Sequence, residues 1–200
     1  MKTLLAEIER VLPDGGSWCE LSKASTLAAL IVGLRPQTVV ELGVWQGGSF
    51  VPMALALKRN GAGRAIAIDP WASAASVVDQ NETNAQWWES TDHSAAYRKF
   101  IGRLEVLDLT RIVDVWRKTS DECDPPECQL LHIDGNHGPT AIRDVERFAA
   151  RVTIGGILCL DDVDWSGGHV RAAWARAQEM GFADIGPIGT GMLMQRRSLG

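Results

Sequence analysis

Three aspartates in two acidic segments of the chain are spaced so that they could bind a metal ion. The segment Leu130–His137 is an apolar run that ends at Asp134, and the segment Gly155–Trp165 holds a second run that ends at Asp161 and Asp162. If the two runs are neighbouring strands of a parallel sheet, their carboxyl ends lie about 4.8 Å apart and the three carboxylates converge. Carboxylate oxygens suit Mg²⁺ or a similar divalent ion, which would offset the repulsion among them.

Histidine supplies the candidates for a general base, because its unperturbed pKa lies near neutrality. His137 follows Asp134 in the turn after the strand and is the first candidate, although it could instead only hydrogen-bond the turn or the next helix. Asp134 is a further catalytic candidate, and His169 is a second candidate for the base. His132 lies inside the predicted strand and is expected in the core, whereas His93 is expected to meet substrate or solvent.

A glycine-rich turn follows the first apolar strand and could bind a nucleotide-like cofactor. The stretch Val39–Ser49 contains Glu41, Gly43 and Gly47 in the spacing acid-x-Gly-x-x-x-Gly. Glycines at the mouth of a parallel sheet let a ligand approach the main chain, because they carry no Cβ. The spacing is not that of a dinucleotide fingerprint, in which Trp45 would be glycine, and the lysine of a P-loop is missing.

The other cofactor candidates are the residues at the ends of the remaining strands, where open parallel sheets bind their ligands. Asp69 ends the second predicted strand, at a position where a carboxylate can accept hydrogen bonds from a ribose diol; the alternative is a turn residue before Pro70. Ser120 follows the third strand and Asp134 follows the fourth. The predicted cofactor site comprises Glu41, Gly43, Gly47, Asp69, Ser120 and Asp134.

These residues require strands and helices that alternate along the chain. The short apolar runs 38–42, 65–68, 112–116, 129–133 and 157–160 are predicted strands, several without polar alternation, as in strands buried on both faces. Helices are predicted over 21–34, 51–59, 95–107, 140–150 and 170–180, after an N-terminal helical region with a break near 12–16. We therefore predict an α/β, Rossmann-like, doubly wound and mostly parallel sheet, with a C-terminal antiparallel hairpin formed by 182–188 and 192–196.

The polar segment 71–97 interrupts this alternation of strands and helices. A connection of this length is usually functional or mobile, and we predict a partly helical lid over the site. The segment holds Trp71, Trp87 and Trp88 in polar surroundings, where a core position is less expected than for the other tryptophans.

The glycine turn and the two acidic motifs together resemble the class I S-adenosylmethionine-dependent methyltransferases. Over residues 36–165, the Ile-Asp-Gly-Asn-His sequence 133–137, followed by Gly155-Gly-Ile and the Asp161-Asp162 pair, is similar to the branch that includes macrocin-type and rhamnosyl O-methyltransferases and cephalosporin-hydroxylase-like proteins. The resemblance implies S-adenosylmethionine as cofactor, and aspartates at Asp134, Asp161 and Asp162 that hold a metal ion beside the acceptor hydroxyls.

The resemblance leads us to expect metal-assisted O-methylation of a small hydroxylated molecule, either a sugar or a natural product. Two alternatives stay open. One is a metal-free N- or O-methyltransferase, and the other is a non-catalytic, cofactor-binding Rossmann-like protein.

Composition argues against several other classes of protein. The chain has 200 residues, of which 46% are hydrophobic and 22% charged, which fits one domain over 1–200 with N-terminal helices in 1–35. The net charge of −5 argues against nucleic-acid binding, and no apolar run reaches the roughly 18 residues of a membrane span. Acids near the N-terminus are unlike a signal peptide, so we expect a cytoplasmic protein with a small-molecule acceptor as partner. Assembly into a homo-oligomer is left open.

Overall fold

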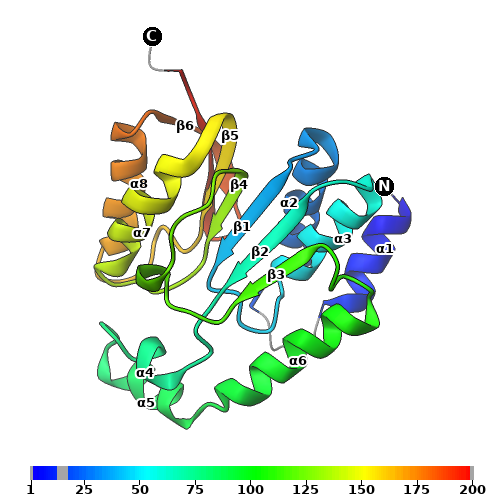
Figure 1. Cartoon of the computed structure of the whole chain (residues 1–200). Helices are drawn as coiled ribbons and strands as arrows, with labels where there is room; N and C mark the ends of the chain where they lie inside the picture. The colour runs from blue at the N-terminus through cyan, green and yellow to red at the C-terminus, as the bar shows by residue number, and fades with distance from the viewer. Residues whose placement is uncertain (1, 13–17, 199–200) are drawn as a thin grey trace.

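The computed structural model, which describes residues 2–12 and 18–198, is built around a seven-stranded sheet (Figure 1). The strands are β1 Thr38–Leu42, β2 Arg64–Ile68, β3 Val113–Trp116, β4 Cys128–Ile133, β5 Val152–Leu160, β6 Phe182–Ile188 and β7 Gly191–Arg196. Their order is β3-β2-β1-β4-β5-β7-β6, with β1 to β5 parallel and β7 antiparallel to both β5 and β6. This confirms the predicted fold class, including its C-terminal hairpin.

The helices lie close to the predicted ranges, and the segment 71–97 adds two more. They are α1 Lys2–Val11, α2 Leu21–Leu34, α3 Phe50–Asn60, α4 Ser73–Ser76, α5 Glu82–Ser90, α6 His93–Val106, α7 Thr140–Phe148 and α8 His169–Glu179, with short 3₁₀ helices at Ser120–Glu122 (η1) and Ala149–Arg151 (η2). Most of the predicted break near 12–16 lies outside the described residues. Among the described helices, none is both long and apolar enough to cross a membrane.

Helices cover both faces of the sheet (Figure 1). Two apolar cores lie between these helices and the sheet. Successive strand residues point to opposite faces, so Val39 and Leu130 pack with α1, α2, α3 and α6. Val40 and Leu131 pack on the other face, with α7 and α8. Both faces of the central strands are therefore buried, which explains why their sequences are continuously apolar.

The direction of winding reverses between β1 and β4. From β1 the chain adds β2 and β3 on one side, and it then returns to add β4 and β5 on the other. Such a switch point leaves a crevice beyond the carboxyl ends of the two central strands. Ile133 pairs with Leu160, so the acids that follow these residues lie side by side, as the sequence predicted.

The loop after β1 lies so close to the turn after β4 that only glycine fits at its start. Gly43 has φ of +79°, and a Cβ on it would lie 2.1 Å from the carbonyl oxygen of Asp134. The approach of a ligand is the reason for this glycine that the sequence predicts. The structure adds a second reason, which is the approach of a neighbouring backbone.

Replacing Gly43 with alanine should therefore lower the free energy of unfolding by about 2–4 kcal/mol, from overpacking and a strained positive φ. Gly135→Ala is the matched control in the facing turn, because a Cβ there has its nearest neighbour at 4.0 Å and φ is not positive. The control should change the free energy of unfolding by less than about 1 kcal/mol. Urea unfolding measures both, and equal losses would contradict the steric argument.

Candidate functional site

A cavity of about 680 Å³ opens at the carboxyl edge of the sheet, beyond the switch point between β1 and β4. Its volume is that of a small-molecule site. The wall comes from the loops after β1 to β5, the turn between β6 and β7, the segment 71–97, the start of α2 with the residues before it, and the first half of α7. The predicted site residues on this wall are Gly43, Asp69, Ser120, Asp134, His137, Asp161 and Asp162.

Asp69 organises the loop after β1. Its Oδ2 accepts hydrogen bonds from the backbone N–H groups of Val44 and Trp45, both at 2.9 Å, and its Oδ1 accepts one from Trp71 N–H at 2.6 Å. Burial raises the pKa of Asp69, and these three donors act against that rise. A carboxylate has about four acceptor sites, so one remains for a ligand in the cavity.

Two of the predicted cofactor residues do not lie on the cavity wall. Glu41 is fully buried beneath the loop, where it accepts a hydrogen bond from Ser49 Oγ at 2.8 Å and lies 3.1 Å from His132 Nδ1. Gly47 faces the core that contains Phe100, where a Cβ would lie 2.8 Å from the Phe100 ring. Both residues therefore support the loop from behind, and His132 is a core residue as expected.

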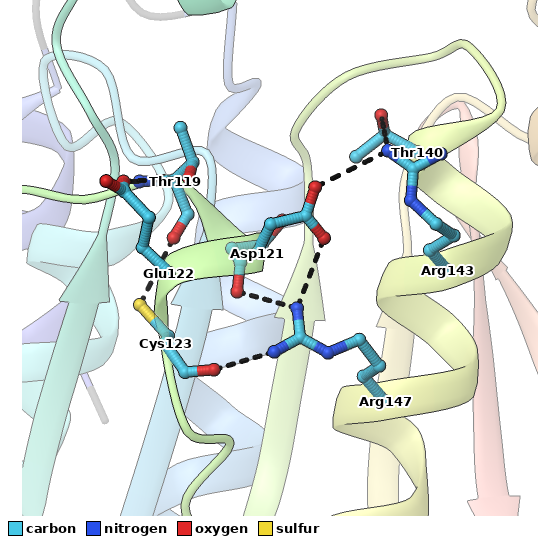
Figure 2. A network of polar contacts seen from close by, with 8 residues as sticks. Thr119, Asp121, Glu122, Cys123, Thr140, Arg143 and Arg147 are labelled. Atoms are coloured by element: carbon cyan, nitrogen blue, oxygen red, sulfur yellow. Dashed lines mark hydrogen bonds and ion pairs between the residues drawn. The ribbon is translucent and has the colours of Figure 1, made fainter.

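The loop after β3 is fixed to α7 by a network of polar contacts (Figure 2). The guanidinium of Arg147 donates to the carbonyl oxygens of Ser120 and Cys123, at 2.8 and 2.7 Å. Asp121 lies 3.3 Å from Arg147 Nη1 and 3.5 Å from Arg143 Nη2. The network explains how Ser120, at the start of η1, is held at the cavity wall.

The ammonium group of Lys23 lies between the acids that end β4 and β5. Lys23 comes from the first turn of α2, and its Nζ lies 3.4 Å from Asp134 Oδ2 and also contacts Asp161 Oδ2. Burial raises the pKa of Asp134 to about 6, although Lys23 opposes the rise. Burial acts in the same sense on Asp161, but there Lys23 prevails and lowers the pKa to about 2.

Asp162 turns away from this group and faces a histidine. Its φ is +49°, and its Oδ2 lies 3.0 Å from His137 Nε2. The nearby His137 ring lowers the pKa of Asp162. The His137 ring stacks on Trp165, with 4.4 Å between centroids and an angle of 19° between planes. His137 is thereby held in place on two sides.

The three predicted metal ligands are therefore divided between two groups. Asp134 and Asp161 share the ammonium of Lys23, whereas Asp162 pairs with His137. The three aspartates do not fit a divalent cation in this arrangement, because the ammonium of Lys23 already compensates the negative charges of Asp134 and Asp161.

His137 is the histidine that reaches the cavity. Of the four histidines, all within the described part of the chain, His132 is in the core and the other two lie off the cavity wall. His169 begins α8. His93 begins α6, where its ring nitrogens lie 2.9 Å from the carbonyl oxygen of Thr91 and 3.0 Å from Ser76 Oγ.

The predicted lid segment, 71–97, packs beside the cavity and contributes α4 and α5 to its wall. Asn136 Nδ2 donates to the carbonyl oxygen of Val78 at 2.6 Å and so connects the segment to the turn after β4. Trp71 differs from expectation, because it is a core residue that is 1% exposed. Its indole N–H donates to the carbonyl oxygen of Trp45 at 2.7 Å, and its ring stacks on Phe100.

Four tryptophans form an aromatic wall at the cavity. Trp18 stacks on Trp45, with 6.0 Å between centroids, and it meets Trp87 and Trp88 edge to face at 5.3 and 5.9 Å. Trp18 and Trp87 are 63% and 45% exposed, which is unusual for such large apolar rings and is typical of a binding surface. These rings therefore offer apolar ring faces and edges to whatever enters the cavity.

Sequence reasoning missed Lys23 and Trp18. The signal for Lys23 was its spacing, because it falls on the same face of α2 as the buried residues Leu27 and Ile31. A lysine in the apolar stripe of a helix requires an acidic partner in the interior. The sequence gives no comparable signal for Trp18, whose neighbours on the wall come from distant segments.

The comparison with known families agrees with this geometry. Residues 40–163 match a family described as a methyltransferase domain. The chain belongs to this methyltransferase family. The match confirms the class I S-adenosylmethionine-dependent methyltransferase that the motifs resembled. No curated protein sequence matches the chain.

Solved structures of methyltransferases share the fold of this methyltransferase. The O-methyltransferase NovP has a TM-score of 0.69 at 16% identity, with 88% of this chain and 80% of that one covered. TomG from Streptomyces achromogenes, an O-methyltransferase of tomaymycin synthesis in complex with S-adenosylmethionine, has a TM-score of 0.63 at 17% identity, with 98% and 90% covered. An O-methyltransferase from Bacillus cereus in complex with S-adenosylhomocysteine has a TM-score of 0.59 at 14% identity, with 96% of this chain and 89% of that one covered.

Asp144 of α7, at the rim of this methyltransferase's cavity, should make stability depend on pH. It is 3% exposed, and burial raises its pKa from 3.8 to about 6, although the neighbouring Ser120 opposes the rise. The folded state therefore binds this proton more tightly than the unfolded chain. The resulting stabilisation is complete below about pH 4 and is lost as the pH rises through 6, by about 3 kcal/mol in all.

Asp144→Asn removes this titration. The free energy of unfolding of the wild type should fall between pH 4 and pH 7 by about 3 kcal/mol more than that of Asp144→Asn. Asp114→Asn, on the exposed side of β3, is the control and should follow the wild-type curve. Urea unfolding across the pH range decides, and parallel curves for Asp144→Asn and wild type would count against a buried, titrating Asp144.

Proposed function

We propose that the protein transfers a methyl group from S-adenosylmethionine to an oxygen atom of a small hydroxylated molecule. One observation carries the proposal: a single cavity combines strand-end residues suited to the cofactor with a His137–Asp162 pair suited to removing a proton. When bound, S-adenosylmethionine supplies a methyl group activated by a positively charged sulfur.

The residues around the loop after β1 fit the cofactor. Gly43 exposes backbone to the cavity, Asp69 has an acceptor site left for a ribose hydroxyl, and Ser120 lies on the same wall. TomG and the Bacillus cereus enzyme hold S-adenosylmethionine and S-adenosylhomocysteine in their structures, which supports the same cofactor here. Glu41 and Gly47 act indirectly, by supporting the loop.

His137 removes the acceptor's proton. Its Nε2 lies 3.0 Å from Asp162 Oδ2. In the proposed mechanism Nε2 carries the hydrogen and Nδ1 receives the proton, while the carboxylate orients the ring and stabilises the imidazolium. As the proton leaves, the acceptor oxygen forms a bond to the methyl carbon. The bond between carbon and sulfur breaks, and its electron pair stays on the sulfur. Holding these atoms in line is the main task of the cavity.

The aromatic wall favours an acceptor with a flat or sugar-like ring. Trp18, Trp45, Trp87 and Trp88 present ring faces and edges, on which aromatic and sugar rings pack well. Two of these tryptophans belong to the segment 71–97, which we propose closes over the acceptor and excludes water.

The proposal takes the metal-free form, because Lys23 already compensates Asp134 and Asp161. Metal-assisted transfer is the second candidate. It is supported by Asp134, His137 and Asp162, which bring one ligand atom each to within 4.8 Å of one another. Activity in EDTA separates the two, since a metal-assisted enzyme loses turnover there.

The activity itself is tested with methyl-labelled S-adenosylmethionine and a panel of phenols, catechols, glycosides and amines. Mass spectrometry should find the label on oxygen, together with S-adenosylhomocysteine. Label found on nitrogen alone would replace O-methylation with N-methylation. A protein that binds no S-adenosylhomocysteine in calorimetry would overturn the proposal.

Replacing Asp69 with alanine should weaken S-adenosylhomocysteine binding about ten-fold or more, because a hydrogen bond to a charged group contributes about 1.5–3 kcal/mol. Asp114→Ala, an exposed acid outside the cavity, should leave the affinity unchanged. Calorimetry measures both variants, with circular dichroism to verify folding. Wild-type affinity in Asp69→Ala would remove this residue from the cofactor site.

Replacing His137 with alanine should lower turnover about 10²–10⁴-fold, the usual contribution of a general base. Its affinity for S-adenosylhomocysteine should stay near the wild-type value. His169→Ala, which lies off the cavity wall, is the matched control and should retain turnover. If steady-state kinetics showed that His169→Ala loses turnover and His137→Ala keeps it, His169 would be the base instead.

A further inference from the structure

We propose that Lys23 supplies, from the protein chain itself, the positive charge that a metal ion supplies in metal-assisted methyl transfer, and that its ammonium group binds the acceptor oxygen. The inference rests on the proposed function, whose cavity and base it shares. It assigns a catalytic residue at the end of the cavity formed by α2, β4 and β5.

The placement of Lys23 is the first argument. Its side chain is 4% exposed, yet it contributes to the cavity wall next to Asp134, Asp161 and Thr190. An ammonium group has three N–H donors. Among the described residues, its hydrogen bonds go to the carboxylates of Asp134 and Asp161. One donor is therefore left for a ligand in the cavity.

Stability of the fold does not explain a lysine at this position. Lys23 lies in the first turn of α2, where the helix dipole disfavours a positive charge. Burying a charged group is expensive, and apolar residues of similar volume often stabilise a protein as well as a buried ion pair does. A lysine placed here against both effects points to a role in chemistry.

The charge balance is the second argument. Two carboxylates and one ammonium leave the group negative overall, and the ammonium of Lys23 between two carboxylates keeps its proton. A permanently charged ammonium cannot act as the base. It can stabilise the negative charge that develops on the acceptor oxygen.

The two halves of the site are complementary. Lys23 holds the acceptor oxygen and makes its proton more acidic, and His137 takes that proton. Asp134 connects them, because it contacts Lys23 and has an oxygen within 4.8 Å of ligand atoms of both His137 and Asp162. The same ammonium repels any divalent cation that approaches Asp134 and Asp161.

Metal binding tests the inference without cofactor or acceptor. Electron paramagnetic resonance of Mn²⁺ should show at most weak binding to wild-type protein. Lys23→Met keeps the size of the side chain and removes its charge, and it should bind Mn²⁺ at least about ten-fold more tightly, because net ligand charge sets affinity. Lys58→Met, a surface cation paired with Asp108, is the control and should behave as the wild type.

Turnover provides a second readout. Wild-type turnover should survive EDTA, whereas Lys23→Met should lose about 10²-fold or more, as on removal of an oxyanion donor. Its affinity for S-adenosylhomocysteine should stay close to wild type, and added Mn²⁺ should restore part of the lost turnover. If Lys23→Met folds poorly, the double variant Lys23→Met with Asp161→Asn removes both charges of the closest pair and should fold. Its turnover should stay low, and added Mn²⁺ should not restore it.

Tight, stoichiometric binding of Mn²⁺ to the wild type, or loss of its turnover in EDTA, would overturn the inference and leave methyl transfer standing. Equal Mn²⁺ affinity in wild type and Lys23→Met would also overturn it. Absence of methylated product with wild type would instead remove the proposed function, while the Mn²⁺ titrations would still report whether Lys23 excludes metal.

Discussion

The site depends on the close approach of two backbone segments at the switch point of the sheet. The Asp134 N–H donates to the Leu42 carbonyl oxygen at 2.8 Å, and the Gly43 N–H donates to that of Ile68 at 3.0 Å. These bonds extend the parallel pairing beyond the ends of β1, β2 and β4, so the loops leave the sheet together. Side chains from these loops therefore line the same cavity beyond the strand ends.

Pairing of opposite charges governs the interior beneath this crevice. Glu41 faces His132, Lys23 faces Asp134 and Asp161, and in each case the partner comes from another element of the fold. A buried charge without a partner is strongly destabilising, so the loss of one member of such a pair leaves the other at a large cost, although replacement of the whole pair need not. The groups that hold the strands' ends together are consequently the same ones that set the electrostatics of the site.

Local pattern determined what could be predicted from the sequence. Apolar runs located β1 to β5, and their parallel order placed Asp134 beside Asp161. The partner of these two acids could not be found that way, because Lys23 reaches them from a helix more than a hundred positions earlier. The same limit applied to Trp71, whose place in the core depends on Phe100 of α6 and not on its own polar neighbours.

Trp45 shows why the loop after β1 and the aromatic wall move together. It stands where a dinucleotide fingerprint has glycine and takes the left-handed conformation that glycine would supply, with φ of +49°. Its backbone N–H is bound by Asp69 and its carbonyl oxygen by Trp71, while its ring packs against Trp18 and Trp88. A ligand that shifts the loop must therefore also shift the aromatic wall, which couples occupation of one half of the cavity to the shape of the other.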